Sequence, residues 1–153
     1  MRFPEIGEEN CSIARTLAVL GERWTLLILR QSFLGVKRFD ELQRTLGIAR
    51  NVLADRLQTL VGEGVLERRR YQDRPPRYEY KLTPKGLDLY PVLVSLMEWG
   101  DRYNAPNGAP VVLVHRTCGK ETHPHFVCSE CGEPLDPREV RSAPGPGALL
   151  ETA

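Results

Sequence analysis

The chain has 153 residues, of which 41% are hydrophobic and 27% charged, and its formal net charge is +1. This composition is typical of a folded globular protein and argues against a disordered or fibrous chain. No apolar run approaches the roughly 18 residues that span a bilayer, and the start of the chain lacks the apolar segment of a secretion signal. The length allows one domain of ordinary size with a small appendage. We therefore expect a cytoplasmic protein with no membrane partner.

Charge is distributed unevenly along the chain. Residues 35–86 contain 12 Lys or Arg and 7 Asp or Glu, a balance of +5, whereas the remaining residues contain 9 and 13, a balance of −4. A basic segment between acidic ends is typical of a protein that binds a polyanion. Chance fluctuation also produces such an imbalance, so the elements within the segment must decide between the two interpretations.

Apolar residues recur at helical spacing in four segments before residue 64, over 11–20, 24–33, 37–46 and 48–61. Asn10 is a suitable N-cap for the first helix, whose apolar positions are Ile13, Leu17 and Leu20. The second segment is apolar on most sides, which indicates a buried helix. Gly47 supplies a tight turn between the last two segments, and this arrangement predicts a helix-turn-helix unit.

After residue 64 the apolar spacing changes from helical to alternating. Residues 65–71 and 76–82 predict two strands of a hairpin, with the turn in the two-proline segment 72–76. Thr83 then caps a helix with a proline in its first turn, and we expect that helix to run to about Trp99. Its apolar stripe, which needs a partner, consists of Leu87, Tyr90, Val94 and Met97. This order of elements predicts a winged helix-turn-helix.

Composition divides the chain into four parts. Residues 1–103 hold the elements described above, 104–110 form a linker, 111–141 form a compact Cys/His module, and we expect the tail 142–153 to be disordered. The expected fold class is therefore α+β: a mainly helical winged helix-turn-helix with a small hairpin, followed by a short zinc-ribbon-like module.

The second helix of a helix-turn-helix enters the major groove of DNA, and its N-terminal residues face the bases. In this chain those residues are Ala49, Arg50, Asn51 and, one turn further, Asp55 and Arg56. Arg50 and Asn51 are the candidate base readers, because arginine pairs with guanine and asparagine with adenine through two hydrogen bonds each. The alternative is that both residues only cap and solvate an exposed helix.

The predicted hairpin carries five arginines, at positions 68, 69, 70, 74 and 77. Alternation sends neighbouring side chains of a strand to opposite faces, so the five cannot all reach one DNA backbone. Arg74 in the turn and Arg77 just after it are the candidates for contact with phosphates or the minor groove, which sets affinity rather than sequence choice. A charged edge strand that resists aggregation is the alternative.

The segment 11–93 resembles the HxlR family of bacterial regulators. The most specific stretches are GERWTLLILR at 21–30, RFDELQ at 38–43 and PPRYEYKLTPKG at 75–86. The resemblance implies a MarR-like fold and a homodimer, built from the first and last helices of the domain, that binds a pseudo-palindromic operator in double-stranded DNA. It also implies a transcription repressor that responds to a small molecule or a thiol-reactive signal. Ala49 departs from the family, which usually has Ser or Thr there, so a capping hydroxyl is missing.

Three of the four cysteines lie close together near the C-terminus. With one histidine they form two pairs of ligands three residues apart, each followed by glycine: His115 and Cys118, then Cys128 and Cys131. This spacing is typical of zinc knuckles, and four protein ligands predict a structural Zn²⁺ without an open position for catalysis. His123 and His125 are alternatives to His115 as the fourth ligand. A metal-free thiol cluster or a redox Cys-x-x-Cys pair is the alternative to zinc.

Cys11 stands apart from the module, near the start of the first helix, where the helix dipole favours a thiolate. The family resemblance implies that this cysteine senses oxidants or electrophiles. A small apolar residue at a dimer seam is an equally good interpretation.

The sequence does not predict an enzyme, because it offers no set of nucleophile, base and orienting group and no glycine-rich phosphate loop. The main prediction is a sequence-specific DNA-binding transcription regulator. The alternative is a winged-helix module that binds another protein and carries structural zinc, an interpretation that the arginine-rich hairpin disfavours.

Overall fold

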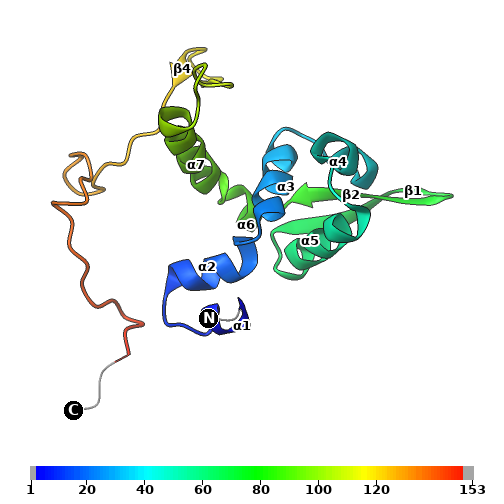
Figure 1. Ribbon diagram of the computed structural model, residues 1–153, viewed down its shortest axis with the longest axis horizontal. Coiled ribbons are helices and arrows are strands. Elements are labelled where there is room, and N and C mark those ends of the chain that lie inside the picture. Colours follow the sequence, from blue (N-terminus) through cyan, green and yellow to red (C-terminus); the bar gives the residue numbers. More distant parts are fainter. Residues whose placement is uncertain (1–2, 150–153) are drawn as a thin grey trace. The chain divides into compact units, whose positions relative to one another are not determined.

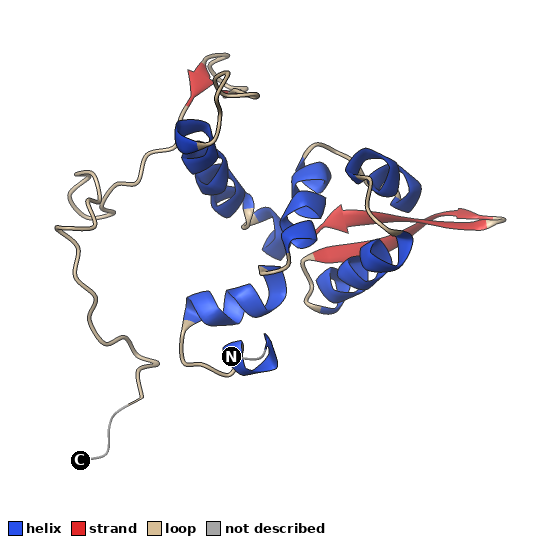
Figure 2. Cartoon of the chain, viewed as in Figure 1, coloured by secondary structure: helices blue, strands red, loops and turns tan. Residues whose placement is uncertain are grey.

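The computed structural model describes residues 3–149, and the chain divides after Leu93 into two compact units. The elements are α1 (Phe3–Ile6), α2 (Ser12–Leu20), α3 (Arg23–Phe33), α4 (Phe39–Leu46), α5 (Arg50–Gly62), β1 (Leu66–Asp73), β2 (Pro76–Leu82), α6 (Pro84–Leu87), α7 (Tyr90–Tyr103), β3 (Leu113–Val114) and β4 (Glu121–Thr122). Figure 1 labels most of them, and Figure 2 distinguishes helices from strands. The described helices are all too short or too polar to cross a membrane.

The core of the first unit lies where α3, α4 and α5 meet the base of the β1–β2 hairpin. Its fully buried apolar side chains are Ile28, Leu29, Leu42, Leu53, Leu57, Leu60 and Leu66. They recur at helical spacing in α3 and α5, so the amphipathic pattern in the sequence predicted these helices correctly. Burying one such side chain stabilises the fold by about 1.5–3 kcal/mol, and the cluster therefore holds α4 and α5 at a fixed angle.

A glycine turn joins α4 to α5, as the sequence predicted. Gly47 adopts φ 63°, a left-handed conformation that costs glycine little, and its N–H donates to the Gln43 carbonyl at 2.9 Å. Ala49 is the N-cap of α5 and makes no side-chain cap hydrogen bond. Its carbonyl accepts the Leu53 N–H at 3.0 Å, so α5 begins without a capping hydroxyl at Arg50, two residues after the predicted start at 48.

The hairpin packs against the helix-turn-helix (Figure 2). β1 and β2 are antiparallel, paired from Leu66 and Leu82 at the base, and the register shifts at Tyr71, where a bulge interrupts the ladder. The Tyr80 N–H donates to the Lys37 carbonyl at 2.7 Å and ties β2 to the loop before α4. The hairpin is therefore the predicted wing, fixed to the helices by a backbone hydrogen bond as well as by packing.

The start of the chain differs from the prediction. Cys11, not Asn10, is the N-cap of α2, because the Asn10 Oδ1 accepts a hydrogen bond from the Arg15 Nη2 at 3.1 Å instead of capping the helix. The sequence also did not predict α1, which is only four residues long. On α2, Ile13 and Leu17 are exposed at 72% and 47%, so the predicted apolar face is only partly covered within one chain.

The single helix expected from Thr83 to Trp99 is broken in two. Thr83 caps α6 as predicted, with its Oγ1 accepting the Gly86 N–H at 3.1 Å, but α6 ends at Leu87 and α7 begins at Tyr90. Pro91 explains the interruption, because proline has no N–H to donate to the carbonyl one turn back.

The second unit holds most of α7, the linker and the Cys/His module. β3 pairs with β4 through Leu113 and Thr122, and Val127 forms an isolated bridge with Pro134. Among the described residues of this unit, only Val94 is buried. The Cys/His module therefore has no apolar core of its own.

The predicted boundaries at 103, 110 and 141 stay predictions, since the two compact units separate within α7. The described part of the expected disordered tail, residues 142–149, contains neither helix nor strand. Residues 150–153 of that tail lie outside the described residues.

Candidate nucleic-acid interface and Cys/His module

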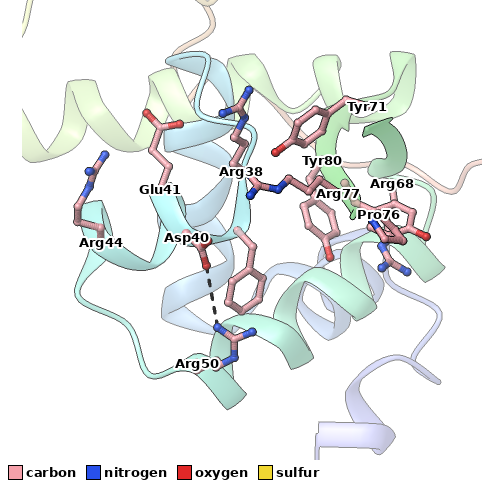
Figure 3. Close-up of a pocket in the computed structure, with 12 residues that line it drawn as sticks. Arg38, Asp40, Glu41, Arg44, Arg50, Arg68, Tyr71, Pro76, Arg77 and Tyr80 are labelled. Carbon is pink, nitrogen blue, oxygen red and sulfur yellow. Dashed lines mark ion pairs between the residues drawn. The ribbon is translucent and has the colours of Figure 1, made fainter. Parts of the chain in front are cut away.

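A groove of about 880 Å³ lies between the start of α4, the start of α5 and the hairpin (Figure 3). Its lining consists of five arginines, Arg38, Arg44, Arg50, Arg68 and Arg77, two carboxylates, Asp40 and Glu41, and the residues Phe39, Tyr71, Pro76, Tyr78 and Tyr80. Five positive and two negative groups leave a formal charge of +3. Such a concentration of arginine in one concave surface attracts polyanions.

Aromatic rings support three of these arginines. The guanidinium carbon lies 4.6 Å from the ring centre for Arg38 over Tyr71, 4.9 Å for Arg50 over Phe39 and 3.7 Å for Arg68 over Tyr78. A cation–π contact at an exposed site contributes about 0.5–1 kcal/mol and does not neutralise the charge. The rings thus restrict these side chains while leaving their N–H groups available to a ligand.

The two candidate base readers stand at the beginning of α5. The Arg50 side chain is 74% exposed, and its Nη1 lies 4.0 Å from the Asp40 Oδ1 (Figure 3). An exposed pair of this kind contributes only about 0–1 kcal/mol, so a nucleic acid can replace Asp40 as the partner. Asn51 follows and is also exposed.

One turn further along α5, Asp55 and Arg56 form an ion pair with each other. The Arg56 side chain is only 23% exposed, so of the predicted site residues it is the least accessible arginine on this helix. Ala49, the remaining predicted contact on α5, is exposed at the N-cap. The structure therefore groups Ala49, Arg50 and Asn51 and places the Asp55–Arg56 pair apart from them.

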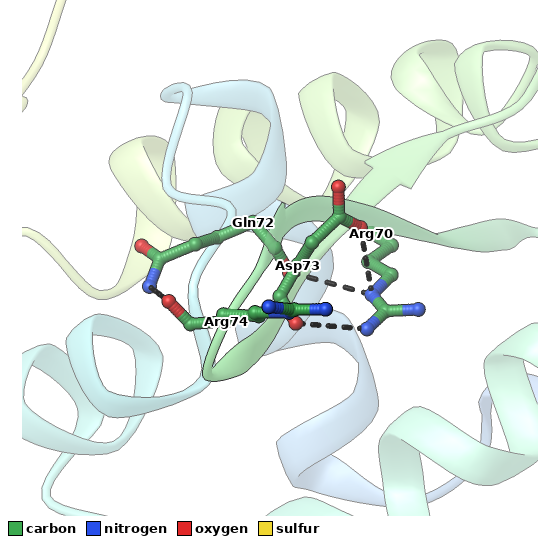
Figure 4. Close-up of polar contacts among 4 residues, drawn as sticks. All are labelled: Arg70, Gln72, Asp73 and Arg74. Atoms are coloured by element: carbon green, nitrogen blue, oxygen red, sulfur yellow. Dashed lines mark hydrogen bonds and ion pairs between the residues drawn. The ribbon is translucent and has the colours of Figure 1, made fainter.

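The tip of the hairpin is organised by Arg70 (Figure 4). Its Nε and Nη2 donate to the carbonyls of Gln72 and Asp73 at 3.4 and 3.0 Å, and its Nε lies 3.3 Å from the Asp73 Oδ1. The Gln72 side chain donates to the carbonyl of Arg74 at 3.1 Å. Arg74 itself is exposed, and no carboxylate within residues 3–149 pairs with its guanidinium.

Alternation separates Arg68 from its neighbour Arg69, as predicted, but it does not describe the residues near the tip of the hairpin, where the register shifts. Arg68 and Arg77 line the groove, whereas Arg69 pairs with Glu67, Nε to Oε1 at 3.1 Å, and does not line it. Arg70 is committed to the turn. Arg77 thus belongs to the groove surface together with Arg68.

Sequence reasoning missed Arg38, Arg44 and Tyr71 as members of this surface. Arg38 is the N-cap of α4, the first helix of the helix-turn-helix, and Arg44 lies in the last turn of that helix. Their place in the groove depends on how β2 folds back beside α4. The charge excess of residues 35–86 was the only signal that pointed to them.

The structure holds the four predicted zinc ligands in two pairs. The His115 Nδ1 lies 3.6 Å from the Cys118 Sγ. Hydrogen bonds from the backbone N–H groups of Cys131 and Glu130, and from the Cys131 side chain, lower the pKa of the Cys128 thiol. No three His, Cys, Asp or Glu side chains within the described residues gather closely enough to hold a metal ion. Zinc therefore stays a prediction at this point.

All four cysteines are free thiols. Cys11 is exposed at the N-cap of α2, where its backbone is extended and its side chain makes no cap hydrogen bond. A thiol in this position is accessible to small reagents.

A helix-turn-helix with a β-hairpin folded beside it around an arginine-lined groove defines a winged helix-turn-helix protein, a class that binds DNA. The HxlR-like helix-turn-helix family matches residues 19–107, and the chain belongs to this family. It is accordingly a transcriptional regulator with DNA as its partner.

Two relatives illustrate the range of similarity in sequence. The chain is 49% identical to the uncharacterized HTH-type transcriptional regulator Rv3095 of Mycobacterium tuberculosis over 146 residues, which cover 95% of this chain and 92% of that protein. It is 34% identical over 96 residues to the regulator YdeP of Bacillus subtilis, covering 62% and 75% of the two chains. The first match must include most of the Cys/His module, whereas the second covers less than two thirds of the chain.

Solved structures also match different shares of the chain. The transcription factor PA1607 superposes with a TM-score of 0.82 and 38% identity, covering 91% of this chain and 98% of that one. A MarR-family regulator from Porphyromonas gingivalis W83 has a TM-score of 0.56 and 33% identity, covering 63% and 95%. The redox regulator HypR in its reduced form has a TM-score of 0.58 and 31% identity, covering 62% and 95%. The predicted winged-helix fold, similar to that of MarR-family proteins, is thereby confirmed.

Proposed function

We propose that the chain is a homodimeric repressor that binds a pseudo-palindromic operator with the arginine-lined groove and the start of α5. The observation that carries this proposal is the groove itself, where arginines of α4, α5 and the hairpin gather beside the N-terminus of the reading helix. Arg50 and Asn51 would read base edges in the major groove, because both are exposed at the first turn of α5.

The other groove arginines bind phosphates in this proposal. Arg38, Arg68 and Arg77 line the groove, and Arg74 is exposed at the hairpin tip, from which it would contact the adjoining minor groove or backbone. Each phosphate that is neutralised adds about 0.9 to the slope of log affinity against log salt. Ala49 contributes through its missing side-chain cap, because the N–H groups of the first turn stay free to bind a phosphate oxygen.

Arg56 and Asp55 have a secondary role in this proposal. Their ion pair must open before Arg56 can reach a base, which makes them less effective readers than Arg50.

Exposed apolar side chains support the homodimer. Ile13 and Leu17 are exposed on α2, and α7 separately exposes Leu96, Trp99 and Tyr103 at 51%, 61% and 63%. The last three are spaced as one helical face, and the rings of Trp99 and Tyr103 lie 5.3 Å apart. An apolar helical face of this kind is typical of a surface that a second subunit covers. A two-fold dimer would place its reading helices one DNA turn apart, about 34–36 Å.

A thiol-reactive signal is the effector that the chain best supports. Cys11 is exposed at the start of α2, the helix that also presents Ile13 and Leu17 to a second subunit. Oxidation or alkylation at this position would alter the dimer and thereby the spacing of its two reading helices. The similarity to the redox regulator HypR supports this proposal.

Two alternatives are weaker. A module that binds proteins does not need a groove with a formal charge of +3, and an enzyme needs a catalytic set that the groove, lined by arginines and tyrosines, does not supply. As a regulator that binds chromosomal DNA, the protein would work in the cytoplasm in this proposal.

The test is selection of genomic DNA fragments by the purified protein, followed by fluorescence anisotropy with the enriched sequence and a scrambled one at two salt concentrations. We expect Arg50→Ala to reduce the preference for the enriched sequence by about 1–3 kcal/mol. Arg68→Ala should weaken binding to both sequences and lower the salt slope by about 1 per subunit, whereas its neighbour Arg69→Ala, outside the groove, should change neither. Selection that enriches no sequence would overturn the proposal.

A further inference from the structure

The Cys/His module contains two tight turns, residues 115–120 and 128–133, with the same backbone geometry. In the first, the N–H of Gly119 donates to the His115 carbonyl at 2.7 Å, and the His115 N–H donates to the carbonyl of residue 120 at 2.9 Å. In the second, the matching distances from Gly132 and Cys128 are 2.9 and 2.8 Å. The two glycines have φ of 69° and 76°, a region that disfavours other residues. The two turns therefore share the same pair of backbone hydrogen bonds and the same glycine conformation.

Each turn presents a ligand at its first and fourth positions. In the first turn, the His115 Nδ1 lies 3.6 Å from the Cys118 Sγ. Zinc bonds of about 2.0–2.1 Å to nitrogen and 2.3 Å to sulfur, at the tetrahedral angle, separate the two ligand atoms by about 3.6 Å. This pair is therefore already at the spacing that a tetrahedral ion requires, and the second turn repeats the arrangement with Cys128 and Cys131.

Nothing else among the described residues accounts for the folding of the module. Val111, Val114 and Phe126 are exposed at 60%, 56% and 63%, and the only regular strands are two residues long. Fixing the backbone of one residue costs roughly 1–2 kcal/mol of conformational entropy, which this little burial cannot offset. The cysteines form no disulfide. A bound metal supplies the missing free energy in small domains of this kind.

We propose that the two turns close on one Zn²⁺, held by the His115 Nδ1 and the thiolates of Cys118, Cys128 and Cys131. Binding releases the three thiol protons to solvent and leaves the centre with a charge of −1. Because the four ligands fill the tetrahedron, the ion is structural rather than catalytic. The described residues hold the ligands as two separate pairs, so the ion must draw the second turn onto the first.

The structure also favours His115 over His123 as the nitrogen ligand. The His123 Nδ1 lies 3.3 Å from the Glu98 Oε1, and its Nε2 lies 3.9 Å from the Glu121 Oε1. Both ring nitrogens of His123 thus face carboxylates, one of them on α7. His125 lies outside both turns and has no counterpart in the repeated geometry.

The test uses the full chain, purified without added chelator or metal. Elemental analysis should find one zinc per chain, and the metal-stripped protein titrated with Co²⁺ should show the absorption of a tetrahedral site with three sulfurs and one nitrogen. Zinc affinity, measured by competition with a chromophoric chelator, should fall by more than about 100-fold in Cys118→Ser, Cys128→Ser and Cys131→Ser. The controls Cys11→Ser and His123→Ala should keep the wild-type affinity.

Two further variants keep the proposal falsifiable if a serine variant loses the fold of the module. His115→Ala should lose tight binding, and His115→Cys should regain it with a Co²⁺ spectrum of four sulfurs. A chain without bound metal that also fails to bind Co²⁺ would overturn the proposal. So would zinc binding that survives His115→Ala and is lost in His123→Ala or in a His125→Ala variant. A Cys128–Cys131 disulfide in place of zinc would assign the cysteines to redox chemistry instead.

Discussion

Replacing Gly86 by alanine should disrupt the junction between the hairpin and the last helices. A Cβ at Gly86 would lie 2.2 Å from the Val65 carbonyl oxygen and 3.0 Å from the Leu82 Cδ2. The Val65 oxygen cannot retreat freely, because it accepts the Thr83 N–H at 3.1 Å. Overpacking costs about 1–3 kcal/mol and a lost hydrogen bond about 0.5–1.5 kcal/mol, so we expect a loss of about 3 kcal/mol. For a unit of this size that corresponds to a fall in Tm of roughly 12–24 °C.

The matched control is Gly62→Ala, since Gly62 has no heavy atom within 4 Å of the added Cβ and does not adopt a positive φ. Alanine should be neutral or stabilise α5 by up to about 1 kcal/mol there. Thermal and urea unfolding followed by circular dichroism measure both variants. A Tm of Gly86→Ala within about 2 °C of the wild type would refute the reasoning, because a backbone oxygen 2.2 Å away must then have moved at almost no cost.

Three other variants test separate elements. Ala49→Ser should stabilise the chain by about 1 kcal/mol in urea unfolding by capping α5, and an unchanged midpoint would contradict the uncapped start. Trp99→Glu should yield monomers in light scattering and weaken operator binding, whereas a persistent dimer would place the subunit contact elsewhere. Cys11→Ser should bind the operator as the reduced wild type does and should no longer respond to oxidant; a retained response would assign sensing to another thiol.

Local patterns in the sequence were sufficient for most of the helical framework. The spacing of Leu53, Leu57 and Leu60 and the glycine at position 47 placed α5 and its preceding turn correctly, because both depend on neighbours along the chain. The division of the last helix was missed although Pro91 signalled it, since the apolar stripe was continuous across the proline. The N-cap of α2 was wrong because the competing partner of Asn10 lies five residues away, at Arg15.

The sequence predicted some residues of the site and missed others. Arg50 and Asn51 were placed at the exposed start of α5 because a helix-turn-helix fixes that position by itself. Arg38 and Tyr71 were not recognised, since they meet only when the hairpin folds back on α4. The sequence also did not predict that Arg70 donates hydrogen bonds within the turn, because the residue types do not specify the direction of the carbonyls that accept them.

The backbone hydrogen bond from Tyr80 to Lys37 has a consequence for regulation. It joins the wing to the loop that enters α4, so the wing and the reading helix of each subunit would approach DNA as one unit. An effector then has no need to change the shape of that unit. Only the distance between the two subunits is left to adjust. In the proposed dimer, a small chemical change near α2 would shift one subunit relative to the other. A shift of about a few ångströms would change the separation of the two reading helices, which would then no longer match one turn of the double helix.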